Sequence, residues 1–313
     1  MENKRVKALV LLSGGLDSIL AVKLLLEQGI EVEAVNFRTN FCGPAKARPA
    51  AKMLGVPLRE VDIREDFLAV LKKPKYGYGA GLNPCIDCHA LMLKKAGQIM
   101  RAEGFDLVAT GEVLGERPMS QHKQALKIVA KEAELEGYLL RPLSAKLLEP
   151  TIPELDGRVD REKLLAIFGR SRKKQIELAE RYGIKNYPTP AGGCALTQEG
   201  FARRLKELME KKPEFSTEDV DLVRFGRHFW IDSTQIILGR NQEENQILES
   251  VAKDGDVLVV PDSFVGPTIL LRGKKIDESA IGKAKELIIK FSPKIKHSKS
   301  DNLVFKIISG NKK

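Results

Sequence analysis

The chain has 313 residues, of which 43% are hydrophobic and 30% charged, and no apolar run approaches the roughly 20 residues that a membrane span requires. This composition predicts a soluble globular protein and excludes a membrane-spanning one, and the length predicts two or three domains. The chain has 52 Lys and Arg against 42 Asp and Glu, and its net charge of +10 favours a polyanionic partner such as RNA. The alternative is that the charges form the surface networks of a heat-adapted protein.

The first residues lead into a strand-like run without a signal-peptide core, so we expect a cytoplasmic protein. Up to about residue 150, short β-rich runs alternate with amphipathic helical stretches, which predicts a doubly wound parallel α/β sheet with helices on both faces. The expected strands are residues 6–12, 32–37, 58–63, 107–110 and 138–141, and the expected helices are 17–27, 44–54, 88–103 and 121–135.

After Pro150 the pattern becomes helical, with expected helices at 161–168, 172–182 and 198–211. A Pro- and Gly-rich loop at 187–193 precedes Cys194, and Pro213 marks a further boundary. Beyond it we expect a small α+β domain, with a helix at 217–225, strand pairs around 228–238 and 257–271, a helix at 278–290 and a basic tail. The predicted domains are therefore 1–150, a helical extension at 151–213, and 214–313.

The first strand runs into Ser13-Gly14-Gly15-Leu16-Asp17-Ser18 and then a helix, and a glycine-rich turn at a helix N-terminus favours a phosphate. Ser13 and Ser18 can add hydroxyl donors, and Asp17 can cap the helix or bind Mg²⁺. The hexapeptide resembles the PP-loop of the adenine nucleotide α-hydrolase superfamily. That resemblance implies a HUP-like fold and cleavage of ATP between the α- and β-phosphates. It also implies adenine contacts from the end of the second strand, at Asn36, Phe37 and Arg38.

The four cysteines favour metal ligands or nucleophiles over disulfides. Cys85 and Cys88 stand at Cys-x-x-Cys spacing where a helix begins, where the helix dipole lowers thiol pKa. Such a pair can hold a metal, a redox dithiol or a persulfide, and Cys194 brings the number of candidate thiols to three. Zinc would need a fourth ligand from His89, Cys42 or water, whereas a 4Fe-4S cluster on three thiolates leaves one iron open. Cys42 is expected to be a bystander thiol.

The run Asn83-Pro84-Cys85-Ile86-Asp87-Cys88 resembles the motif of bacterial tRNA 2-thiouridylases, in which Asp occupies the place of Cys85 in many members. The resemblance implies that Cys88 and Cys194 are the two catalytic cysteines. Cys85 in place of that Asp matches the three-cysteine pattern of iron-sulfur-dependent tRNA thiolases, which implies a 4Fe-4S cluster on Cys85, Cys88 and Cys194, with Zn²⁺ as the alternative.

Thr110-Gly111-Glu112 ends the fourth strand, and with Ser120-Gln121 and Arg141-Pro142-Leu143 it resembles motifs of the 4-thiouridine synthetases, where they lie beside ATP. Near the C-terminus, residues 224–230 and 238–245 resemble the RNA-binding domain called NFACT-R. Arg227, His228, Trp230 and Arg240 combine cations with an aromatic plane, which suits base stacking and phosphate contact. Lys294, Lys296, His297 and Lys299 in the tail add positive charge.

These features together predict an RNA sulfurtransferase that uses ATP and Mg²⁺ to adenylate a uridine carbonyl and replaces its oxygen with sulfur, with Asp17, Cys85, Cys88 and Cys194 as catalytic residues. The expected partners are tRNA or another RNA and a sulfide or persulfide donor, and a homodimer is compatible with the sequence. Two alternatives stay open. One is a PP-loop amide- or nitrile-forming ligase with structural zinc, and the other is a non-catalytic RNA-binding sensor of nucleotide or redox state.

Overall fold

A computed structural model describes residues 5–188, 194–292 and 303–310 of the chain. By its internal contacts the chain divides into two compact units, Met1–Glu199 and Gly200–Lys313, and each is described by itself. The expected boundary at residue 150 falls inside the first unit and that at 213 inside the second, so the three-part division stays a prediction. Within the described residues no helix combines the length and the apolar character needed to cross a bilayer.

The first unit is built on a five-stranded sheet in the order β3-β2-β1-β4-β5, and every pair of neighbours is parallel. This confirms the predicted parallel α/β sheet. The strand order reverses between β1 and β4, and ligands of open α/β sheets bind at the carboxyl ends of strands at such a point. The strands are β1 (Lys7–Leu11), β2 (Glu31–Arg38), β3 (Leu58–Asp62), β4 (Leu107–Thr110) and β5 (Leu139–Leu140).

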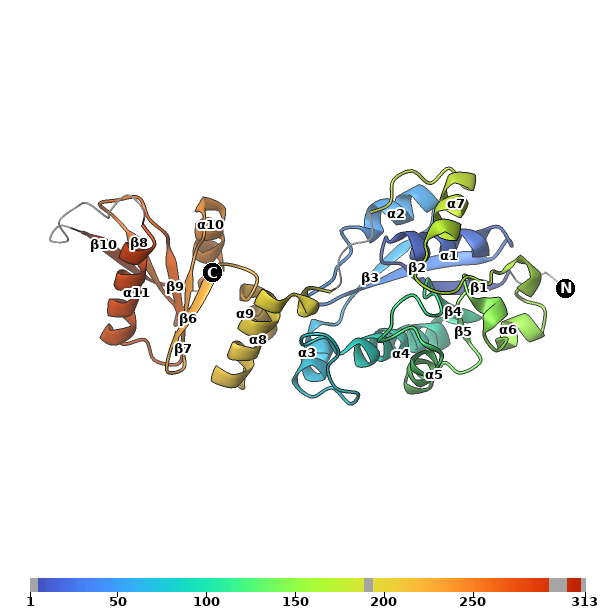
Figure 1. The fold of residues 1–313 in the computed structure, drawn as a ribbon, viewed down its shortest axis with the longest axis horizontal. Helices are drawn as coiled ribbons and strands as arrows, with labels where there is room; N and C mark the ends of the chain where they lie inside the picture. The colour runs from blue at the N-terminus through green and yellow to red at the C-terminus, as the bar shows by residue number, and fades with distance from the viewer. Residues whose placement is uncertain (1–4, 189–193, 293–302, 311–313) are drawn as a thin grey trace. The chain divides into compact units, whose positions relative to one another are not determined.

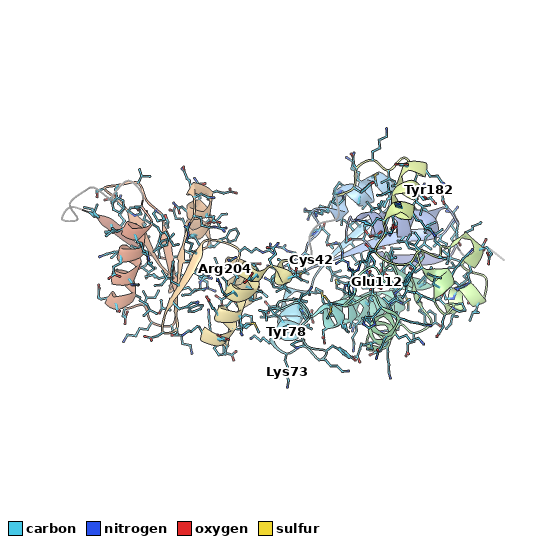
Figure 2. All side chains as sticks on the ribbon, viewed as in Figure 1. Cys42, Lys73, Tyr78, Glu112, Tyr182 and Arg204 are labelled. Atoms are coloured by element: carbon cyan, nitrogen blue, oxygen red, sulfur yellow. The ribbon has the colours of Figure 1, made fainter. Side chains whose placement is uncertain are left out.

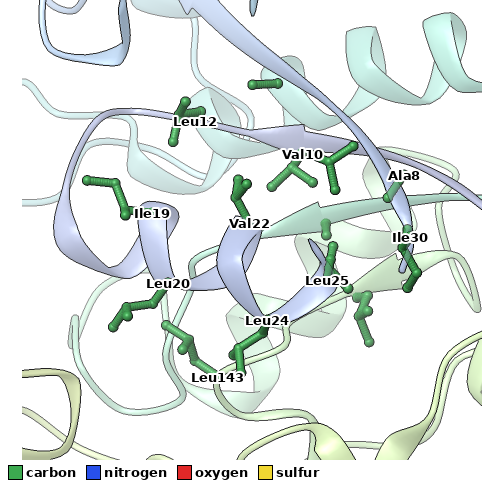
Figure 3. Close-up of a cluster of buried hydrophobic side chains, with 14 of the residues drawn as sticks. Ala8, Val10, Leu12, Ile19, Leu20, Val22, Leu24, Leu25, Ile30 and Leu143 are labelled. Carbon is green, nitrogen blue, oxygen red and sulfur yellow. The ribbon is translucent and has the colours of Figure 1, made fainter. Parts of the chain in front are cut away.

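Helices cover both faces of this sheet (Figure 1). Because side chains alternate along β1, Ala8, Val10 and Leu12 pack with α1 on one face, while Leu9 packs with α4 and α5 on the other. Figure 3 shows the first of these clusters, in which Leu20 and Leu24 of α1 lie near Leu143. The helices are α1 (Leu16–Leu26), α2 (Ala47–Leu54), α3 (Arg64–Lys72), α4 (Cys85–Glu103), α5 (Lys123–Glu132), α6 (Ile152–Leu155) and α7 (Lys173–Arg181).

Three helices of this unit differ from expectation. Helix α3 and the four-residue helix α6 were not predicted. The expected helix at 161–168 is wrong, because only a 3₁₀ turn forms at Arg161–Lys163. The following backbone runs extended, with the N–H of Leu165 donating to the Pro142 carbonyl at 3.0 Å and that of Ile167 to the Leu143 carbonyl at 2.8 Å. Long-range partners therefore satisfy the backbone groups that a helix would have paired locally.

The second unit has a five-stranded antiparallel sheet in the order β10-β8-β9-β7-β6. Helix α11 packs on one face, while Leu222 of α9 and Leu248 of α10 pack on the other, which confirms the expected α+β class. The elements are α8 (Glu199–Lys211), α9 (Thr217–Leu222), β6 (Arg227–Ile231), β7 (Thr234–Leu238), α10 (Gln242–Val251), β8 (Val257–Pro261), β9 (Ile269–Arg272), α11 (Glu278–Lys290) and β10 (Phe305–Ser309).

The sequence analysis missed α10 and β10. The last described residues are not only a basic tail, because β10 pairs with β8 from Phe305 opposite Pro261 to Ser309 opposite Val257. The expected tail residues Lys294, Lys296, His297 and Lys299 lie outside the described residues.

Candidate active site

The phosphate loop lies between β1 and α1, at the carboxyl end of the central strand. Gly14 has φ +79°, and a Cβ added there would stand 2.2 Å from the Lys46 carbonyl oxygen, so only glycine fits. The two serines hold the shape of the loop: their hydroxyl oxygens lie 3.2 Å apart, and the Ser18 hydroxyl donates to the Gly15 carbonyl at 2.8 Å. The loop thus has a fixed backbone at the start of an eleven-residue helix, α1.

The end of β4 packs directly on this loop. A Cβ on Gly111 would lie 2.5 Å from the backbone carbonyl carbon of Asp17 and from the backbone nitrogen of Ser18. The absence of a side chain at Gly111 therefore lets the two backbones touch. Two motifs almost a hundred residues apart in the sequence, the phosphate loop and Thr110-Gly111-Glu112, are brought together because β1 and β4 are neighbours in the sheet.

Asp17 faces Arg172, which precedes α7, and the Arg172 guanidinium donates to Asp17 Oδ2 at 3.2 Å. Burial raises the pKa of the Asp17 carboxyl, and Arg172 and Gln175 oppose that rise. Among the described residues, the buried oxygen Oδ1 has no hydrogen-bond partner. An unpartnered carboxylate oxygen beside a phosphate loop fits a Mg²⁺-nucleotide complex, since Mg²⁺ binds through one or two carboxylates and substrate phosphates.

The residues expected to contact adenine have different surroundings. Asn36 is buried and donates to the Leu12 carbonyl at 2.8 Å, and Phe37 is buried in the core, whereas Arg38 is exposed. The polar side-chain groups left for a nucleotide are therefore the Arg38 guanidinium and Asn36 Oδ1, which has no hydrogen-bond partner among the described residues. A pocket of about 290 Å³ that sequence reasoning did not find adjoins Gly14, and it is lined mostly by small and apolar residues: Ala45, Lys46, Pro49, Ala50, Met53, Asn186 and Pro188.

Glu112 is buried and joins the nucleotide side of the site to the cysteine helix. Its label in Figure 2 marks its place in the first unit. One carboxylate oxygen is 2.8 Å from His89 Nδ1, and the other accepts from Arg141 at 2.9 Å and from Thr110 at 3.1 Å. Burial alone would raise the pKa of Glu112, but Arg141 and His89 lower it to about 2. The carboxylate, which we expected to bind the cofactor, is thus occupied by protein groups that fix α4 against β4.

Cys85 and Cys88 lie in the first turn of α4, and both are half-buried. Asp87 between them accepts the backbone N–H groups of Lys75 and Tyr76 at 2.9 and 3.0 Å, which fastens the preceding loop to the helix. The segment of the third cysteine docks nearby, since the N–H of Leu82 donates to the Leu196 carbonyl at 3.1 Å.

The thiols influence one another. Burial raises the pKa of Cys88 well above its usual range, and Cys42, Cys194 and Cys85 raise it further, which places all four cysteines within electrostatic range. Burial also raises the pKa of Cys85, opposed by Arg117. The pKa of both thiols is thus shifted upward by burial, the opposite direction to the shift expected from their place at the helix start. Cys42, expected to be a buried or bystander thiol, is exposed, and it is one of the residues that act on Cys88.

The sequence predicted a metal centre on the cysteines, either a 4Fe-4S cluster or zinc. Within the described residues, no three His, Cys, Asp or Glu side chains are arranged to hold a metal ion. His89, a candidate fourth zinc ligand, is engaged by Glu112. As positioned, the cysteines do not fit either a 4Fe-4S cluster or zinc.

In the second unit, the four residues expected to bind RNA do not form one surface. Arg227 is exposed on the edge strand β6 and lies 4.9 Å from the centre of the Phe291 ring. His228 and Trp230 alternate to the other face of the strand, and burial lowers the pKa of His228 to about 4. Arg240 is ion-paired with Glu244, which also accepts the Gly226 N–H at 3.2 Å. Of these four residues, only Arg227 is an exposed cation for which the described part of the chain shows no carboxylate partner.

The fold and the site define an α/β nucleotide-binding protein whose phosphate loop lies beside a group of thiols. Residues 6–162 match the family model described as tRNA methyl transferase HUP domain, and the chain belongs to this family. Residues 226–312 match the model of the NFACT protein RNA binding domain. Both matches agree with the resemblances predicted from the motifs.

Curated relatives include the tRNA-specific 2-thiouridylase MnmA of Syntrophotalea carbinolica, 33% identical over 185 residues, covering 52% of this chain and 50% of the relative. The MnmA of Nitratidesulfovibrio vulgaris is 31% identical over 229 residues, covering 66% and 60%. The chain spans about half the length of the curated relatives it matches. A 4-thiouridine synthetase-RNA complex with bound ATP is a solved structure with a TM-score of 0.39 and 21% identity, covering 69% of this chain and 52% of that one.

Proposed function

We propose that this chain is an ATP-dependent RNA sulfurtransferase, with tRNA as its substrate, that adenylates a uridine carbonyl and replaces its oxygen with sulfur. The observation that carries the proposal is the meeting of the phosphate loop, β4 and the cysteine helix at the switch point of the sheet, joined by Glu112 and His89. The thiouridylase relatives support the substrate class. Activated substrate and sulfur would then share one site.

In the first step, the backbone N–H groups of the phosphate loop bind the phosphates of ATP. The uracil carbonyl oxygen attacks the α-phosphorus, the bond between the α-phosphorus and the bridging oxygen breaks, and pyrophosphate leaves. A Mg²⁺ ion on Asp17 would neutralise charge on the phosphates. The step is needed because a carbonyl oxygen is a poor leaving group, whereas adenylate is a good one. Positioning by the rigid loop supplies much of the acceleration.

In the second step, sulfur replaces AMP. A persulfide on Cys88 attacks the activated carbon through its terminal sulfur, and AMP leaves with the C–O electron pair. The Cys194 thiol then attacks the Cys88 sulfur, which releases the thiocarbonyl product and leaves a disulfide between Cys88 and Cys194. An external thiol reductant restores the two thiols, and a persulfide carrier supplies the sulfur. Burial raises the pKa of the Cys88 thiol, and the persulfide formed on it is a stronger acid than that thiol.

Nucleoside mass spectrometry of tRNA tests this proposal. The protein is incubated with unmodified tRNA, ATP, Mg²⁺, a persulfide donor and a thiol reductant, and digestion is expected to yield a thiolated uridine only when ATP is present. ATP turnover without any thiolated nucleoside would instead support the ligase alternative. RNA binding with neither reaction would support the sensor. Iron and acid-labile sulfide after anaerobic purification would assign the sulfur to a cluster and would contradict the persulfide step.

We further propose that the second unit binds the RNA, supported by its match to an RNA-binding family. Arg227→Gln is expected to weaken tRNA binding several-fold and to lower the slope of log affinity against log salt by about one, since a phosphate contact releases a counterion. The control is Lys283→Gln, which removes an equal charge already paired with Glu286 at 2.9 Å. Equal affinities for both variants and the unaltered chain in a salt series would remove Arg227 from the interface.

A further inference from the structure

The N-terminus of helix α7 lies against the phosphate loop. Arg172 immediately precedes this nine-residue helix, and its guanidinium contacts Asp17 Oδ2 at 3.2 Å. The side chains of Arg172 and Asp17 are only 19% and 21% exposed, so the pair is shielded from water. Nothing in the sequence motifs pointed to α7, which is 155 residues away from Asp17 along the chain.

Buried polar groups without partners gather at this contact. Arg172 Nε, both amide atoms of Gln175 and Asp17 Oδ1 are inaccessible to solvent, and none makes a hydrogen bond of ordinary geometry within the described chain. Gln175 is fully buried, and its amide lies close enough to Asp17 to lower the pKa of the carboxyl. An unsatisfied buried polar group costs about 1–3 kcal/mol, so folded proteins rarely keep several together. Such a cluster beside a phosphate loop indicates a polar ligand.

The charges identify the class of ligand. The Asp17 carboxylate by itself would repel a phosphate, and Arg172 is the cation that neutralises it. A guanidinium has five N–H donors in one plane. Arg172 can therefore keep its ion pair with Asp17 and still donate a hydrogen bond to a phosphate oxygen. The first backbone N–H groups of α7 have no partners inside the helix and add to this positive potential.

We propose that Arg172 and Gln175 form a second wall of the phosphate site, opposite Ser13–Ser18, which binds the β- and γ-phosphates of ATP and holds pyrophosphate after cleavage. This wall rests on the proposed function and deepens it, because it adds Arg172 and Gln175 to the loop groups that hold the phosphates of the leaving group. Its binding role does not depend on which nucleophile attacks. Arg172 is therefore a residue that touches the reacting substrate, while Gln175 orients Asp17 and the phosphate together.

Isothermal titration of the full chain with Mg²⁺-pyrophosphate, ATP and AMP tests the wall. Arg172→Gln is expected to weaken pyrophosphate and ATP binding tenfold or more and to leave AMP binding unchanged, because AMP lacks the β- and γ-phosphates. The matched control is Lys174→Gln, which removes the same charge from an exposed position on the same helix. The control is expected to bind all three ligands as the unaltered chain does.

Unchanged pyrophosphate affinity in Arg172→Gln, or an equal loss of AMP affinity, would overturn the proposal. Should that variant fail to fold, as judged by its melting curve, Arg172→Lys keeps the charge beside Asp17 but loses the fork, and pyrophosphate binding is still expected to fall several-fold. Unchanged pyrophosphate affinity in Arg172→Lys would likewise contradict a role for the planar guanidinium donors. Failure of tRNA thiolation, with Arg172-dependent pyrophosphate binding intact, would remove the proposed reaction and leave this site standing.

Discussion

Cys194→Ala is expected to abolish the thiolated nucleoside while pyrophosphate is still released, and Asp17→Ala is expected to abolish both. The difference follows from the proposed order of steps, in which the phosphate loop acts before any thiol. Asp17 lies in that loop with a buried oxygen free for the nucleotide complex. Cys194 lies in the separate segment that docks on Leu82, beside the cysteine helix. The two substitutions should therefore separate adenylation from sulfur transfer.

The measurement is a single-turnover reaction with enzyme in excess over unmodified tRNA, in which radiolabelled pyrophosphate and thiolated nucleoside are followed in the same sample. Cys42→Ala is the matched control, because Cys42 is a cysteine of the same group whose exposed thiol contacts Thr39 Oγ1 at 3.2 Å and has no step in the proposed reaction. Full product from Cys194→Ala, or loss of product from Cys42→Ala alone, would assign the sulfur chemistry to a different thiol.

Glu112→Ala is expected to destabilise the first unit by about 3–5 kcal/mol at pH 7. The substitution leaves Arg141, whose side chain is 7% exposed, as a buried cation without its partner, and breaking a buried ion pair from one side costs about this much. It also releases His89 and with it the tie between α4 and β4. Chemical unfolding followed by circular dichroism measures the change.

Two controls come from the chain itself. Trp230 is the single tryptophan and lies in the second unit, so its fluorescence should report an unchanged transition for that unit. Glu149→Gln removes an exposed carboxylate that is paired with Lys127 at 2.8 Å, and a surface pair of this kind contributes only about 0–1 kcal/mol. A Glu112→Ala loss no larger than that of Glu149→Gln would show that the buried network does not hold the unit together.

Glu112 also makes the stability of the first unit depend on pH. The pKa of Glu112 is about 2 in the folded chain against an ordinary 4.5, so its contribution to stability is complete above pH 4.5 and is lost as the pH falls toward 2. The difference corresponds to roughly 3 kcal/mol. Between these pH values, the unfolding free energy of the unaltered chain should fall more steeply than that of Glu112→Gln. An equal pH dependence of the unfolding free energy in the two proteins would contradict the lowered pKa of Glu112.

The local features of this protein could be predicted from its sequence. Apolar periodicity located all five strands of the first unit, and the glycine-rich turn between a strand and a helix marked Gly14. The alternation of side chains along β6 is equally local. It implies that Arg227 and His228 lie on opposite faces of the sheet, although the sequence interpretation placed them on one RNA-binding surface. Periodicity and glycine geometry depend on neighbours a few residues away, which is why they are legible in one sequence.

The state of the site groups was decided only by the tertiary structure. The pairs Arg172 with Asp17 and Glu112 with Arg141 join distant segments, and no spacing rule encodes them. For Cys88 the sequence supplied the helix start, which lowers a thiol pKa, but packing supplied the burial, which raises it more. Desolvation and charge pairing depend on what surrounds a group in space, so the sequence determined which residues were available and the fold determined what each one can do.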